Sequence, residues 1–172
     1  MANAAKRASL VIMAISEMVT FVVTIGTVAF FISEAGDTDL TLDIGFYGRE
    51  EFVLFASAVG FFVALFSMIV AILGAQENSH WAATMATLHA FGALVLLVSA
   101  SLLAKTTMTY DSKDLCKQIK KDSNDARCYQ LIIGLSFAFV SMVLFIGDTT
   151  IYVVTLAQHT GISFVNMDNL SS

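Results

Sequence analysis

Long apolar stretches alternate with shorter polar segments along this chain. Four apolar stretches run from about Ala8 to Ile32, Phe52 to Ala75, Trp81 to Ala104 and Tyr129 to Ala157. An α-helix needs roughly 20 mostly apolar residues to cross a bilayer, and each stretch is long enough. All four are too continuously apolar for the strands of a membrane barrel, in which polar and apolar positions alternate. The pattern predicts a single all-α domain over residues 1–172, folded as an antiparallel bundle of four transmembrane helices.

Composition supports a membrane protein and excludes several other classes. Hydrophobic residues make up 57% of the 172 residues and charged residues only 13%. A water-soluble domain needs more polar surface than this to cover its core. Basic residues form no stripe interleaved with aromatic residues, so nucleic acid is not an expected partner. The expected surroundings are the lipid bilayer and other membrane proteins, or further copies of this chain.

The polar links between the helices predict how the bundle is oriented. Only residues 76–80 separate the second and third helices, which predicts a tight hairpin. The longer links, 33–51 and 105–128, are then two extracellular loops on the opposite side. Lys6 and Arg7 precede the first helix, which favours cytoplasmic N- and C-termini. A plain count of basic residues disagrees, because most of them lie in the second loop, but the first helix usually dominates orientation. The predicted location is the plasma membrane or a secretory-pathway vesicle.

Two cysteines, Cys116 and Cys128, both lie in the second long loop. A pair within one polar loop is typical of a disulfide on the oxidising side of the membrane. The alternative is two free thiols in a cytoplasmic loop. Eleven residues separate the cysteines, so this is not a CxxC redox motif. No cluster of Cys and His has the spacing of zinc ligands, and the sequence predicts neither a metal nor a cofactor.

Three ionisable residues, Glu17, His89 and Asp148, interrupt the apolar stretches. With a rise of 1.5 Å per residue, all three lie roughly 12–14 Å from the inner boundary of the membrane. Ser67 reaches the same level on the second helix. We therefore expect one polar layer in the inner half of the bundle. Either this layer holds the helices together, because the groups satisfy one another's hydrogen bonds, or it is a proton or cation site with His89 between two carboxylates.

Small residues four positions apart predict faces where helices pack closely. Each of the last three helices carries such a stripe. The expected packing residues are Ala56, Gly60, Ala64, Ala82, Ala86, Ala90, Gly134 and Ala138.

The layout of the whole chain resembles the MARVEL-type tetraspan proteins, which include the physins, MAL-like proteins and occludin-like junction proteins. The shared features are a short N-terminal segment, four helices, a very short inner link and two outer loops. A cysteine pair in the second outer loop recurs in some members, and Cys116 and Cys128 occupy that place here. The resemblance implies a non-enzymatic role in organising membranes or junctions, or as an accessory subunit of a larger membrane complex. The sequence contains no P-loop, nucleophile elbow or HExxH motif, and we predict no catalytic residue. The alternative is a small proton- or cation-coupled transporter that uses Glu17, His89 and Asp148.

Overall fold

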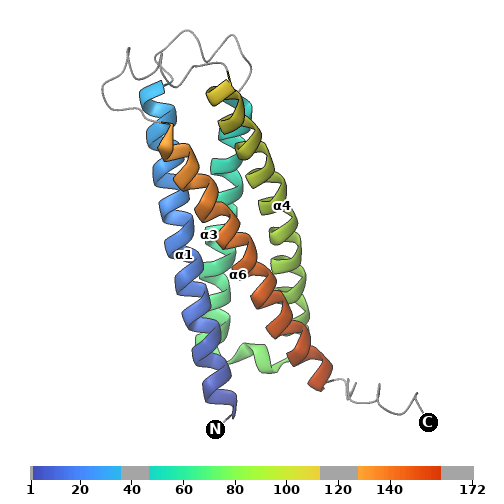
Figure 1. Cartoon of the computed structure of the whole chain (residues 1–172). Helices are drawn as coiled ribbons and strands as arrows, with labels where there is room; N and C mark the ends of the chain where they lie inside the picture. The colour runs from blue at the N-terminus through green and yellow to red at the C-terminus, as the bar shows by residue number, and fades with distance from the viewer. Residues whose placement is uncertain (1, 36–46, 113–127, 160–172) are drawn as a thin grey trace, which may run out of the picture.

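The computed structural model describes residues 2–35, 47–112 and 128–159, and these form a bundle of long α-helices (Figure 1). The helices are α1 (Ala2–Ala35), α3 (Tyr47–Leu73), α4 (Ser79–Ser112) and α6 (Tyr129–His159). Each contains a segment long and apolar enough to cross a membrane. The predicted all-α bundle with four transmembrane helices is confirmed.

The four helices pack as a closed ring around a common core. Helix α1 packs against α3 and α6, and α4 packs against the same two neighbours. Helices α1 and α4 therefore face each other across the centre of the bundle. Helix α1 begins and α6 ends at the end where a short turn joins α3 to α4, which we call the hairpin end (Figure 1). We call the opposite end, where α1 and α4 end and α3 and α6 begin, the loop end.

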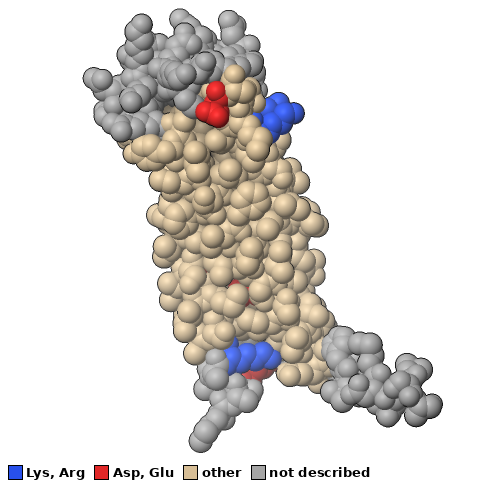
Figure 2. Space-filling view, viewed as in Figure 1, with Lys and Arg blue, Asp and Glu red and all other residues tan. Residues whose placement is uncertain are grey.

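Charged side chains on the face shown in Figure 2 gather at the two ends of the bundle. The flank between them shows no charged side chain except for a small acidic spot in its hairpin-end half. Large apolar side chains are exposed on the outer surface of each of the four helices. Examples are Val22, Phe62, Leu94 and Val143. A flank of this composition is stable in contact with lipid tails, which agrees with a bundle that spans the bilayer.

Every helix extends beyond at least one limit that hydropathy alone predicts, and α4 extends furthest. The sequence places the end of the third helix at Ala104, but α4 continues to Ser112. Lysine is a good helix former, so Lys105 ends the apolar run without ending the helix. Tyr110 is buried in this extension and packs edge-on against Phe31, with ring centroids 5.6 Å apart. Helix α3 likewise begins at Tyr47, within the predicted first loop.

The turn at the hairpin end depends on Gly74. This residue follows α3 with φ 71° and ψ 14°, the left-handed conformation in which glycine commonly ends helices. The short 3₁₀ helix η1 (Ala75–Glu77) follows, and Asn78 Oδ1 accepts a hydrogen bond from the backbone N–H of His80 at the start of α4. A side chain at Gly74 would meet the guanidinium of Arg7. Arg7 in turn forms a 2.7 Å ion pair with Glu77, which places the start of α1 against this turn.

The apolar core consists of three clusters stacked along the bundle. The loop-end cluster is formed by Val28, Phe31, Val53, Leu103, Tyr110 and Leu131. The middle cluster is formed by Phe21, Ala64, Ala93, Leu96 and Phe145. The hairpin-end cluster is formed by Leu10, Val70, Ala71, Ala82, Met85, Ala86 and Tyr152. The membrane-embedded polar residues described below lie where the middle and hairpin-end clusters meet.

Candidate functional site

The three ionisable residues of the apolar stretches meet at the centre of the bundle. His89 Nε2 lies 3.5 Å from Asp148 Oδ2 and 4.0 Å from Glu17 Oε2. The residues come from α4, α6 and α1, and all three side chains are fully buried. One ligand atom from each lies within 4.8 Å of the others. We call Glu17, His89 and Asp148 the central triad.

The orientation of the His89 ring is set by its own helix. Its Nδ1 lies 2.9 Å from the carbonyl oxygen of Met85, one turn earlier in α4. A carbonyl oxygen can only accept a hydrogen bond, so Nδ1 carries a proton and donates it. The other ring nitrogen, Nε2, therefore points at the two carboxyl groups. The rings of Phe145 and Tyr152 lie 4.9 and 5.6 Å from the His89 ring, measured between centroids, and pack around it.

The central triad has unused hydrogen-bonding capacity. Among the described residues, both carboxyl oxygens of Glu17, both of Asp148 and Nε2 of His89 have no hydrogen-bond partner. Buried polar atoms are rarely left in this state, because each loses its contacts with water and gains nothing in return. The arrangement can accept a positively charged particle among its five unpartnered atoms, either a proton or a metal ion.

Ser67, the fourth residue of the expected layer, is also fully buried, and its hydroxyl group bonds to a tyrosine. Its Oγ lies 3.0 Å from the hydroxyl of Tyr152, which joins α3 to α6. Sequence reasoning missed Tyr152. It follows Asp148 by four positions and therefore lies on the same face of α6, a spacing that could have identified it.

A second hydroxyl pair, also missed in the sequence, lies on the loop-end side of the triad. Ser141 Oγ donates to Thr20 Oγ1 at 2.7 Å and links α6 to α1. Thr20 Oγ1 donates to the backbone carbonyl of Glu17 at 2.8 Å. Thr20 follows Glu17 by three positions and Ser141 precedes Asp148 by seven, so both share a helix face with a triad residue.

Another buried acid, Glu50, lies near the loop end. The sequence assigns it to the first loop, but it is in the first turn of α3 and only 4% exposed. Tyr110 donates a side-chain hydrogen bond to its carboxylate and so joins α4 to α3. The predicted and observed positions of Glu50 differ because a charged residue at a membrane boundary ends an apolar run, whether or not the helix ends there.

Most of the expected packing residues lie at helix contacts. Gly60 lies against Phe21, whose ring would be 2.5 Å from an added Cβ, and Gly134 lies against Val28 and Thr27 of α1. The other buried members are Ala56, Ala64, Ala82, Ala86 and Ala138. Ala90 differs, because it is exposed on the outer surface of α4.

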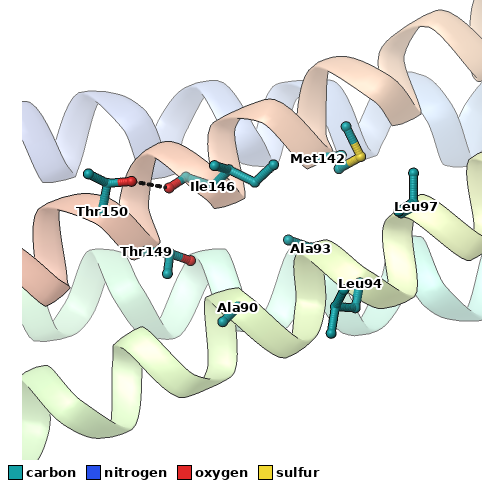
Figure 3. Close-up of a pocket in the computed structure, with 8 residues that line it drawn as sticks. All are labelled: Ala90, Ala93, Leu94, Leu97, Met142, Ile146, Thr149 and Thr150. Carbon is teal, nitrogen blue, oxygen red and sulfur yellow. Dashed lines mark hydrogen bonds between the residues drawn. The ribbon is translucent and has the colours of Figure 1, made fainter.

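Ala90 lines a pocket of 350 Å³ between α4 and α6 (Figure 3). Helix α4 contributes one wall and α6 the other. The pocket is lined by Ala90, Ala93, Leu94, Leu97, Met142, Ile146, Thr149 and Thr150. Thr150 Oγ1 donates its hydrogen to the Ile146 carbonyl at 2.9 Å, so its hydroxyl is already satisfied within α6. The pocket is an apolar groove in the lipid-facing flank.

The predicted disulfide cannot be placed, because Cys116 lies outside the described residues. Cys128 directly precedes α6 at the loop end, and its carbonyl accepts a 3.4 Å hydrogen bond from the N–H of Ile132.

Comparison with known proteins identifies the family. The MARVEL membrane-associating domain matches residues 7–151, which include most of all four helices and the complete central triad. The curated proteins and the solved structures give no significant match. The domain match covers well over half of the chain and agrees with the four-helix architecture, so this chain belongs to the MARVEL family of membrane-associating proteins.

Proposed function

We propose that this protein acts without catalysis, by lateral association with other membrane proteins. It organises membranes or junctions, or accompanies a larger membrane complex as an accessory subunit. The observation that carries this proposal is the match to a membrane-associating domain over residues 7–151. In the expected orientation both termini are cytoplasmic, in the plasma membrane or a secretory vesicle.

The groove between α4 and α6 is the surface that we propose for association. Leu94 is 62% exposed and Ile146 50% exposed on its two walls. Ala90 lies on the α4 wall one turn before Leu94, and its side chain is small enough to let another backbone approach closely. In a bilayer, apolar side chains gain little free energy when they move from lipid into a helix contact. Helix association there depends on close packing, which small residues allow. The proposed occupant is a transmembrane helix of a partner protein.

Site-specific crosslinking in native membranes tests this assignment. A photoreactive amino acid at Leu94 reports on the groove, and the same group at Val22, 58% exposed on α1, is the matched control. We expect a discrete protein adduct from Leu94 that is absent from Val22. Lipid adducts alone at both positions would refute association through the groove.

The central triad favours a second function, proton- or cation-coupled transport. Ionisable groups at membrane depth often mark ion pathways. Against this function, the middle and hairpin-end apolar clusters lie on both sides of the triad. Purified protein in liposomes decides between the two functions. Flux of protons or cations that Glu17→Gln abolishes would establish transport, and its absence would leave association as the function.

A further inference from the structure

We propose that Glu17, His89 and Asp148 bind one divalent transition-metal ion of the zinc class inside the membrane. The three donors come from helices α1, α4 and α6, and their ligand atoms lie within 4.8 Å of one another. All three side chains are fully buried, and their donor atoms have no hydrogen-bond partner among the described residues. Three buried and unpartnered donors this close together can share one ion, which distinguishes them from an exposed group of neighbouring charges.

The distances fit shared ligation better than direct hydrogen bonds. A charge-assisted N–H···O bond is about 2.7–2.9 Å long. His89 Nε2 lies 3.5 and 4.0 Å from the two carboxylate oxygens, too far for such a bond. Two ligands that each lie about 2.1 Å from one tetrahedral ion are about 3.4 Å apart. Side-chain shifts of less than about 1 Å therefore suffice to close the triad on a zinc-sized ion.

Charge balance also favours a divalent ion. Glu17 and Asp148 contribute two negative charges when ionised, and His89 with a protonated Nδ1 is a neutral ligand. One divalent cation makes the whole site neutral in a single binding step, whereas protons do so only when two of them bind, and one proton on His89 leaves a net negative charge in the bilayer interior. A net charge at this depth is costly because no water is present to solvate it.

The His89 hydrogen bond prepares Nε2 as a ligand. Histidines that bind metals almost always donate their other ring N–H to a carbonyl or carboxylate, which fixes the tautomer and the direction of the lone pair. The 2.9 Å contact from Nδ1 to the Met85 carbonyl is such an interaction. One imidazole and two carboxylates suit zinc, whereas calcium and magnesium select oxygen ligands alone. A second carboxylate oxygen or a water molecule completes the coordination.

Burial assigns a structural role to the ion. The middle and hairpin-end clusters close the bundle on either side of the triad, so the ion enters as the helices pack together. Once bound, it ties α1 to α4 across the centre of the bundle and both to α6. Because binding and packing are coupled, removal of the metal loosens the bundle. We therefore expect slow loss of the ion to chelators from the folded protein.

Metal analysis of the full-length protein, purified in mild detergent without a polyhistidine tag, tests the site. The probes are Zn²⁺ supplied during expression and Co²⁺ supplied during refolding of metal-free protein. We expect roughly one zinc per chain with nitrogen and oxygen ligands at about 2.0–2.1 Å by X-ray absorption. Cobalt should give visible absorption bands of a four- or five-coordinate ion. Glu17→Gln, Asp148→Asn and His89→Gln should each reduce bound metal more than about tenfold.

The matched control is Glu77→Gln, which removes an exposed carboxylate at the hairpin end and should leave metal content unchanged. If the triad variants fail to fold, the absorption spectra of the wild-type protein decide. Monodisperse wild-type protein that holds no stoichiometric zinc or cobalt after both treatments would overturn the proposal. Metal content that stays equal in folded triad variants, or a ligand shell containing sulfur, would also overturn it. The outcome does not depend on whether a partner occupies the α4–α6 groove.

Discussion

Ser67 of α3 and Tyr152 of α6 share a hydrogen bond of 3.0 Å between two fully buried hydroxyl groups. Helices α3 and α6 lie diagonally across the bundle, so this bond joins elements that otherwise make few contacts. Together with the central triad, it brings polar groups from all four helices into the interior of the membrane.

Removing the Tyr152 hydroxyl should destabilise the protein. Tyr152→Phe leaves Ser67 Oγ buried without its partner, which costs about 1–3 kcal/mol. Adding Ser67→Ala removes the stranded group, and the double variant should recover part of the loss. Denaturant unfolding in detergent measures all three proteins. Thr87→Ala is the control, because Thr87 is exposed and its hydroxyl bonds only to its own helix. Strictly additive losses would show that the two hydroxyls are not coupled.

Gly60→Ala should destabilise the α1–α3 contact. An added Cβ would lie 2.5 Å from Phe21 Cζ, and Phe21 is fully buried with its ring edge-on against Phe145 at 5.6 Å. Because the ring has no room to retreat, we expect a loss of about 1–3 kcal/mol in unfolding free energy. Gly26→Ala is the matched control on α1, where a Cβ meets nothing within 4 Å. An equal response of the two variants would contradict the packing argument.

The predicted orientation can be tested with single cysteines at the two ends of the bundle. Glu77 lies at the hairpin end and Asp111 near the loop end, and both are exposed. With cytoplasmic termini, a membrane-impermeant maleimide should label Asp111→Cys in intact cells. Glu77→Cys should react only after the cells are permeabilised. The wild-type protein reports any background from its own cysteines, and the reverse labelling pattern would invert the orientation.

Cys116 and Cys128 should be joined by a disulfide. The motivation is the sequence, since they are the only two cysteines and share one predicted outer loop. Mass spectrometry without reduction should find a peptide pair linked through both residues. Replacing both by serine should lower the free energy of unfolding by about 2–3 kcal/mol. The loss stays moderate because the loop they close is short. Two alkylatable thiols in protein isolated from native membranes would argue for a reducing environment instead.

Hydropathy was sufficient to predict the four helices, because a bilayer requires about 20 apolar residues for each crossing. The constant rise of a helix also assigned Glu17, His89 and Asp148 a common depth, and the structure brings their side chains together. The depth of a residue in the membrane does not show which way its side chain faces around the helix axis, however. Lipid-facing Phe62 is as apolar as buried Phe21, so composition does not distinguish the flank from the core. For this reason Tyr152 could not be paired with Ser67 from the sequence alone.

The central triad also has a consequence for biosynthesis. Glu17 enters the bilayer with α1 before the ribosome has made α4 or α6, which carry its two neighbours. Until they arrive, the acid carries an insertion penalty of about 2.5–3.5 kcal/mol that the apolar residues of α1 must outweigh. A half-made bundle thus lacks both neighbours of this acid, and we expect membrane quality control to respond to that difference. A fragment that ends after α3 should be degraded rapidly in cells, and Glu17→Leu should prolong its half-life.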